Sequence, residues 1–148
     1  MNIRKQEGFT IIELLIVIIV VGVLAIVVVF AYAGIKQKDR NNERHDDITI
    51  IHAQVEQYFA QTGKYPTISD LNSTSWRKAN MKAFDADWLK DPSGKTSALA
   101  DKPAASVYSY QATTSDNSTC NDSGKNCVKY VLTATYEGGG TFTESNLN

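Results

Sequence analysis

The sequence is poor in cysteine and proline, and both shortages restrict what the chain can be. Its two cysteines, Cys120 and Cys127, can form one disulfide between them, which excludes a small scaffold held together by several bridges. The three prolines all lie beyond residue 65, so no proline interrupts a helix before that point. The formal net charge is only -1, which argues against a specific nucleic-acid site and against an acidic solvating tail.

Motifs that carry catalysis or hold a metal are also lacking. The glycines 138–140 have neither the lysine nor the following helix of a phosphate loop, and no nucleophile elbow is present. His45 and His52 are seven residues apart, about 10 Å along a helix, which is too far to share one metal ion. The polar residues 116–126 could supply oxygen ligands to calcium, but their spacing does not fit a helix–loop–helix calcium loop, so we favour a hydrated loop. We expect no enzyme, no metal and no cofactor.

A long apolar stretch follows the first eight residues. From Phe9 to Tyr32 only Thr10, Glu13 and Gly22 interrupt it, and at about 1.5 Å per residue such a helix crosses a hydrocarbon core of about 30 Å. Because basic residues precede the stretch, we expect the leader to stay in the cytoplasm and the rest to face outward. An ordinary secretory signal would be shorter, although cleavage near Ala33 is an alternative.

Residues 8–17, Gly-Phe-Thr-Ile-Ile-Glu-Leu-Leu-Ile-Val, resemble the processing motif of type IV prepilins. The resemblance implies that a prepilin peptidase and N-methyltransferase cuts between Gly8 and Phe9 and methylates the new amino group of Phe9. It also implies that Glu13 pairs with this ammonium group of a neighbouring subunit, since a buried carboxylate is costly without an opposite charge. Alternatively, Glu13 stays hydrated among the lipid headgroups.

The helical pattern continues beyond the apolar stretch. One apolar stripe recurs at helical steps, at Ile48, Ile51, Val55 and Tyr58. Gly63, followed by Pro66, predicts the end of a helix that begins at Phe9 and is roughly 80 Å long. Many type IV pilins have a proline in this helix. Here its absence leaves Gly22 and Gly34 as candidate weak points.

Charged residues fill the helix between 36 and 47. Their spacing predicts three ion pairs, Lys36–Asp39, Arg40–Glu43 and Arg44–Asp47. These charges either form weak pairs on a hydrated face or bridge subunits when the helices bundle.

The remaining residues predict a small head of mixed structure. Met81, Phe84, Trp88 and Leu89 sit at helical steps and are expected in its core. Alternating apolar residues predict strands near 107–112, 128–136 and 141–143, which form an antiparallel sheet on the outer half of the long helix. Outside the cytoplasm, a disulfide between Cys120 and Cys127 is favoured over free thiols.

The expected fold class is therefore α+β, similar to type IV pilins. It has four segments: a cleavable leader (1–8), a transmembrane and assembly helix (9–35), an amphipathic stalk helix (36–63) and a globular head (64–148). The resemblance implies a structural subunit of a type IV pilus filament, active in adhesion, motility or DNA uptake. The alternative is a pseudopilin of a type II secretion system, because residues 88–94 resemble a segment common in pseudopilin heads. An anchored binding module that never polymerises is a third hypothesis.

The resemblance also implies partners and a location. The expected partners are further copies of the chain in a helical filament, the prepilin peptidase, an inner-membrane assembly platform, minor pilins and membrane lipid before assembly. The chain is expected in the cytoplasmic membrane with its head outside, and then in an extracellular filament.

Overall fold

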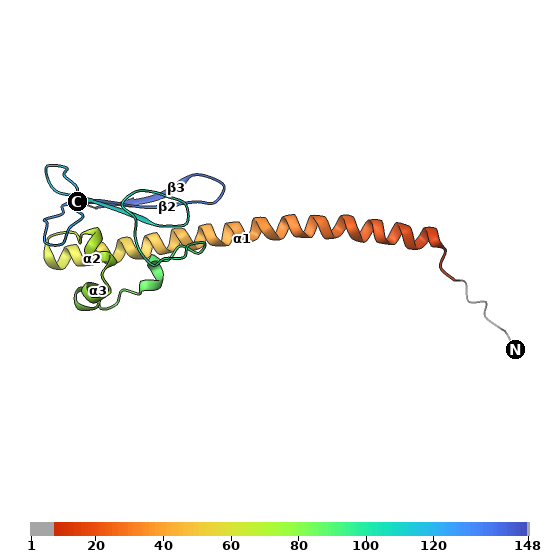
Figure 1. Ribbon diagram of the computed structural model, residues 1–148, viewed down its shortest axis with the longest axis horizontal. Coiled ribbons are helices and arrows are strands. Elements are labelled where there is room, and N and C mark those ends of the chain that lie inside the picture. The colour runs from red at the N-terminus through yellow and green to blue at the C-terminus, as the bar shows by residue number, and fades with distance from the viewer. Residues whose placement is uncertain (1–7, 148) are drawn as a thin grey trace. The chain divides into compact units, whose positions relative to one another are not determined.

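The computed structural model describes residues 8–147 and divides the chain into two compact units, with the boundary between Lys38 and Asp39. Helix α1 (Ile11–Thr62) runs through both units, and the other described helices and strands belong to the second (Figure 1). A long helix followed by a small antiparallel sheet confirms the expected α+β class. Residues 1–7, which form most of the expected leader, lie outside the described residues.

Helix α1 ends where the sequence predicts. Gly63 has a positive φ of +73°, and its amide donates a hydrogen bond of 2.8 Å to the carbonyl of Phe59. This is a left-handed cap, which glycine adopts without steric cost. The helix is unbroken at Gly22 and Gly34, and a Cβ atom would meet open space at both. The two glycines therefore weaken α1 only through their intrinsic propensity, by about 1 kcal/mol each relative to alanine.

The second unit has its own hydrophobic core, built around the outer part of α1. The predicted stripe is buried: Ile48, Ile51 and Val55 are fully covered, and Tyr58 is 9% exposed. Side chains from the sheet and the connecting segments complete the core, namely Tyr65, Leu71, Met81, Leu89, Leu99, Tyr108, Tyr110, Tyr130, Leu132 and Ala134.

Three antiparallel strands form a sheet in the order β1-β2-β3, with β1 at Ser109–Thr113, β2 at Lys129–Thr135 and β3 at Thr141–Ser145. Figure 1 shows the sheet lying along the outer part of α1. Tyr110 pairs with Leu132 in the register, and both face the core. Positive φ angles at glycines 138–140 turn the chain from β2 into β3. The predicted strands are confirmed, with bounds that differ by up to two residues.

Short helices connect α1 to the sheet: α2 (Ile68–Asn72), α3 (Thr74–Asn80) and the 3₁₀ helix η1 (Ala86–Leu89). Met81, Phe84, Trp88 and Leu89 stand at helical steps in the sequence but do not lie on one helix, because α3 ends before Met81 and η1 begins at Ala86. Their burial is nevertheless as expected. Met81 and Leu89 are core residues, and Phe84 and Trp88 pack against them.

Candidate functional site

The segment from Gly8 to Glu13 forms the start of α1. Phe9 is 86% exposed, and the helix begins two residues later at Ile11. Thr10 is the residue before the helix, and its amide and Oγ1 each donate a hydrogen bond of 2.8 Å to Glu13 Oε2. The amide of Glu13 donates in return to Thr10 Oγ1 at 3.3 Å. This reciprocal arrangement is a capping box, which satisfies helix amides that have no partner within the helix.

The first unit exposes nearly all of its apolar surface. Every large apolar side chain from Phe9 to Ile35 is about half exposed or more. The mean hydropathy of the most apolar part of α1 is 3.6, so by length and composition this helix can cross a membrane. An apolar surface of this size requires lipid or other helices around it.

A cluster of charged side chains lies at the start of the second unit. Arg44 is 1% exposed, and its Nε and Nη2 donate to the two carboxylate oxygens of Asp91 at 2.6 and 2.9 Å. Nη2 also contacts Glu137 Oε1 at 3.0 Å. Arg40 binds both oxygens of Glu137, and Ser93 Oγ donates to Glu137 at 2.8 Å. The arginine bonds hold the pKa of Glu137 well below its usual range, with Arg40 as the largest cause.

These contacts correct the expected pairing along the helix. Arg40 and Arg44 were predicted to pair with Glu43 and Asp47, but both bind carboxylates from distant parts of the head. The physical reason is geometry. Both arginines bind their carboxylates through two nitrogens, which is stronger than a single solvated contact on a helix surface, and the Arg44–Asp91 pair is also shielded from water.

Comparisons with known proteins agree with the N-terminal geometry. A family model described as the prokaryotic N-terminal methylation motif matches residues 3–29. The type II secretion system core protein G of Dickeya chrysanthemi is 38% identical over 64 residues, which is 43% of this chain and 42% of that protein. The protein of the same name from Aeromonas hydrophila is 34% identical over 67 residues, 45% of this chain and 47% of the relative.

The N-terminal part of the chain is similar to the type IV pilin and pseudopilin family. It spans less than half the length of the two relatives above. A longer match to core protein G of Pseudomonas aeruginosa has 28% identity over 112 residues, 76% of this chain and 78% of the relative. No solved structure matches the chain.

In the head, Asp47 is a buried carboxylate without a cationic partner among the described residues. It is 9% exposed and accepts a hydrogen bond of 2.7 Å from the hydroxyl of Tyr108. Burial is the largest cause that raises the pKa of Asp47 to about 6, and nearby carboxylates add to it. Asp47 is therefore partly protonated in mildly acidic solution.

The structure joins Cys120 and Cys127 in a disulfide with a Cα–Cα distance of 5.9 Å. The loop between them is tied to the connection after α1. Tyr65 donates to the carbonyl of Cys127 at 2.9 Å, and the Ser69 amide donates to the carbonyl of Asn121 at 3.2 Å. The disulfide thus fixes the loop against the end of the long helix.

The histidines lie on α1 but do not share a site. The ring of His45 packs against that of Phe142 in a tilted arrangement, with ring centroids 4.2 Å apart. His52 Nδ1 lies 2.7 Å from the hydroxyl of Tyr130, which donates to Glu56 Oε1 at 2.9 Å. Within residues 8–147, no group of three or more His, Cys, Asp or Glu side chains has the arrangement of a metal site.

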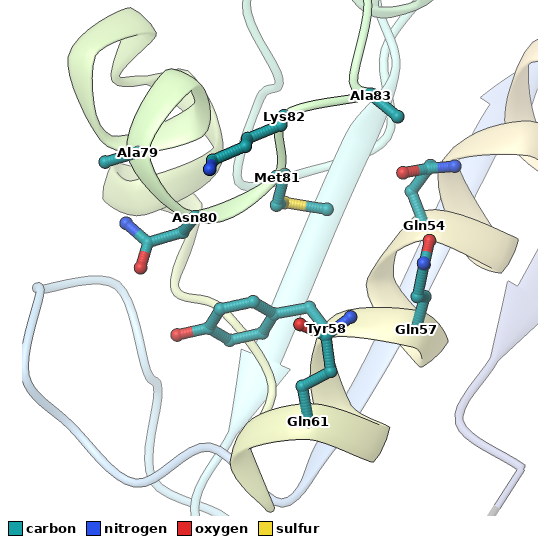
Figure 2. Close-up of a pocket in the computed structure, with 9 residues that line it drawn as sticks. All are labelled: Gln54, Gln57, Tyr58, Gln61, Ala79, Asn80, Met81, Lys82 and Ala83. Atoms are coloured by element: carbon teal, nitrogen blue, oxygen red, sulfur yellow. The ribbon is translucent and has the colours of Figure 1, made fainter.

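A pocket of about 400 Å³ lies between the outer part of α1 and the end of α3 with the residues that follow it. Figure 2 shows glutamine side chains on the α1 wall and Asn80, Met81 and Lys82 on the opposite wall. The lining residues are Gln54, Gln57, Tyr58, Gln61, Ala79, Asn80, Met81, Lys82 and Ala83. These side chains offer hydrogen bonds but no paired acid and base.

Of the residues predicted to function in processing, assembly or disulfide formation, the structure brings together only those that are close in sequence. Gly8, Phe9 and Glu13 lie in one segment, and Cys120 meets Cys127. The role of Thr10 as a helix cap was missed, although the spacing Thr-x-x-Glu signals it. The ion-pair cluster in the head was missed as well.

Proposed function

We propose that this chain is a pseudopilin of a type II secretion system, a structural subunit that assembles through the first part of α1. The methylation motif over residues 3–29 carries this proposal, together with the three relatives described above, each named as core protein G of that system. The surface pilin remains the competing member of the family, and the experiment below separates the two.

In the proposed pathway, the prepilin peptidase cuts between Gly8 and Phe9 and methylates Phe9. The exposed start of α1 suits this step, because Phe9 lies outside the helix and is open to an enzyme. Until assembly, lipid of the cytoplasmic membrane covers the apolar first unit. In the filament, the same helices of neighbouring copies replace the lipid.

The capping box supports a specific role for Glu13. In the single chain, its carboxylate already accepts two hydrogen bonds from Thr10. During assembly, the ammonium group of Phe9 from a neighbouring copy joins or replaces these donors. Only one docking register supplies that opposite charge, so Glu13 sets the register.

The second unit supports a location outside the cytoplasm. Its disulfide is stable in an oxidising compartment and uncommon in the cytosol. The unit has a compact core, and the pocket of about 400 Å³ beside α1 offers hydrogen bonds without a paired acid and base, so the proposed role is structural rather than enzymatic. The proposed partners are further copies, minor pseudopilins and the inner-membrane assembly platform.

Mass spectrometry of the membrane-bound chain tests the processing step. We expect an N-terminus at methylated Phe9 in the native chain. The variant Glu13→Gln should be cut but should not form filaments. Glu43→Gln is the matched control, because Glu43 is exposed and forms no ion pair among the described residues. An intact Met1, or cleavage after Ala33, would contradict the proposal.

Deletion of the gene in its host separates the two kinds of filament. If the chain is a secretion pseudopilin, exported enzymes should accumulate inside the cell envelope, while surface fibres should persist. Loss of sheared surface fibres with normal secretion would instead identify a surface pilin.

A further inference from the structure

Arg77 in α3 is a buried cation without a carboxylate partner. It is 4% exposed and forms no ion pair within the part of the chain that the structure describes. Its guanidinium donates to the carbonyl of Leu71 and, at 3.3 Å, to Thr74 Oγ1. Burial lowers the pKa of Arg77, because desolvation disfavours its charge.

The contrast with Arg44 shows what Arg77 lacks. Arg44 is equally buried, but Asp91 and Glu137 balance its charge. Arg77 has only neutral acceptors and the ring of Phe84, 5.8 Å from its central carbon. A buried charge is costly unless an opposite charge accompanies it. These contacts therefore position the guanidinium without neutralising it.

Arg77 lines a pocket of about 420 Å³ that is strongly basic. Lys78 and Lys82 line it too, and neither forms an ion pair among residues 8–147. Asp85 is the one carboxylate in the lining, so three cations against one anion leave two positive charges in excess. Figure 2 shows Lys82 reaching back toward the end of α3, and Lys82 lines both this pocket and the one drawn there.

We propose that the pocket around Arg77 binds a phosphate group. A phosphate monoester or free phosphate carries a charge of about -1.5 to -2 at neutral pH, which balances the two excess positive charges of the lining. A single carboxylate would neutralise only about half of that positive charge. The planar guanidinium supplies directional donors, the two lysines supply mobile charge, and Thr74 Oγ1 adds a neutral donor. The proposal is independent of filament assembly.

A phosphate titration of the full chain in nonionic detergent micelles tests the site. The amide resonances of Arg77, Lys78 and Lys82 are followed by NMR at constant ionic strength near neutral pH. We expect a saturable shift with inorganic phosphate and a much smaller one with acetate. The double variant Lys78→Ala/Lys82→Ala should bind about tenfold more weakly, since it loses two charge-assisted contacts. Lys95→Ala, an exposed lysine outside the pocket, should bind as the native chain does.

The source of the phosphate group is resolved by a second titration with glycerol 3-phosphate. Binding of both probes identifies a site for phosphate on a larger molecule, and binding of inorganic phosphate alone identifies a site for the free ion. The absence of a saturable shift with either probe would overturn the proposal. So would an equal response to acetate, or equal weakening by Lys95→Ala. The double variant keeps the buried Arg77 in place, so the test does not depend on replacing a residue that the fold of the head needs.

Discussion

Replacing Asp47 with asparagine should stabilise the head at neutral pH and lose that advantage in acid. Asp47 is nearly covered, and its only described hydrogen-bond donor is the hydroxyl of Tyr108 at 2.7 Å. Above its pKa the folded head must hold a buried negative charge. Asparagine has a similar shape, and its carbonyl oxygen can accept the same hydrogen bond.

The magnitude follows from the pKa shift. The pKa of Asp47 rises from an ordinary 3.8 to about 6 in the folded head, and about two units correspond to roughly 3 kcal/mol. Between these two values the folded state binds more protons than the unfolded state. The free energy of unfolding therefore falls as pH rises through this window, and the loss is complete above about pH 6. Asp47→Asn should remove most of this loss.

Urea unfolding of the full chain in detergent, followed by tryptophan fluorescence, measures the effect. We expect the variant to exceed the native chain by about 2–3 kcal/mol near neutral pH and by little near pH 4. Asp101→Asn is the matched control, because Asp101 is an exposed acid of the head and is not among the groups that raise the pKa of Asp47. A less stable Asp47→Asn at neutral pH, or a difference that does not change with pH, would refute this reasoning.

Three further predictions concern the other contacts. Arg44→Met should destabilise the head by about 3–5 kcal/mol in the same unfolding assay, because it leaves a buried carboxylate unpaired, while Arg40→Met should destabilise it much less, because the Arg40 pair is more exposed. Replacing Cys120 and Cys127 with serine should lower the free energy of unfolding by about 2–3 kcal/mol. The native chain should lose the same amount under reducing conditions, which would assign the loss to the disulfide. Thr10→Ala should weaken the first turn of α1 by about 1 kcal/mol, seen as roughly fivefold faster amide exchange there, whereas unchanged exchange would contradict the capping role.

Local signals in the sequence predict the long helix and the sheet well. The helix end follows from Gly63, whose backbone angle few other residues tolerate. The strands follow from alternation, since Tyr130, Leu132 and Ala134 all face the core. These features depend on residues that are close together in the chain, so they can be predicted from the sequence alone.

Contacts between distant residues were not predictable in the same way. Asp91 and Glu137 lie 47 and 93 positions from Arg44, and helix spacing pointed to Asp47 instead. Burial decides that choice, and burial depends on the whole head. The same limit applies to Arg77, whose charge is notable only because the fold covers it without a carboxylate beside it.

The charged cluster has a mechanical consequence. The backbone leaves α1 for the rest of the head at one place only, Gly63, at the far end of the helix. Near the other end of this unit, Arg40 and Arg44 fasten the segments around Asp91 and Glu137 to the helix. The head is therefore attached to α1 at two places, by the backbone at Gly63 and by the ion pairs of Arg40 and Arg44. When a force acts along α1, the guanidinium bonds share the load with the peptide connection, and the head cannot swing away from the helix about a single hinge.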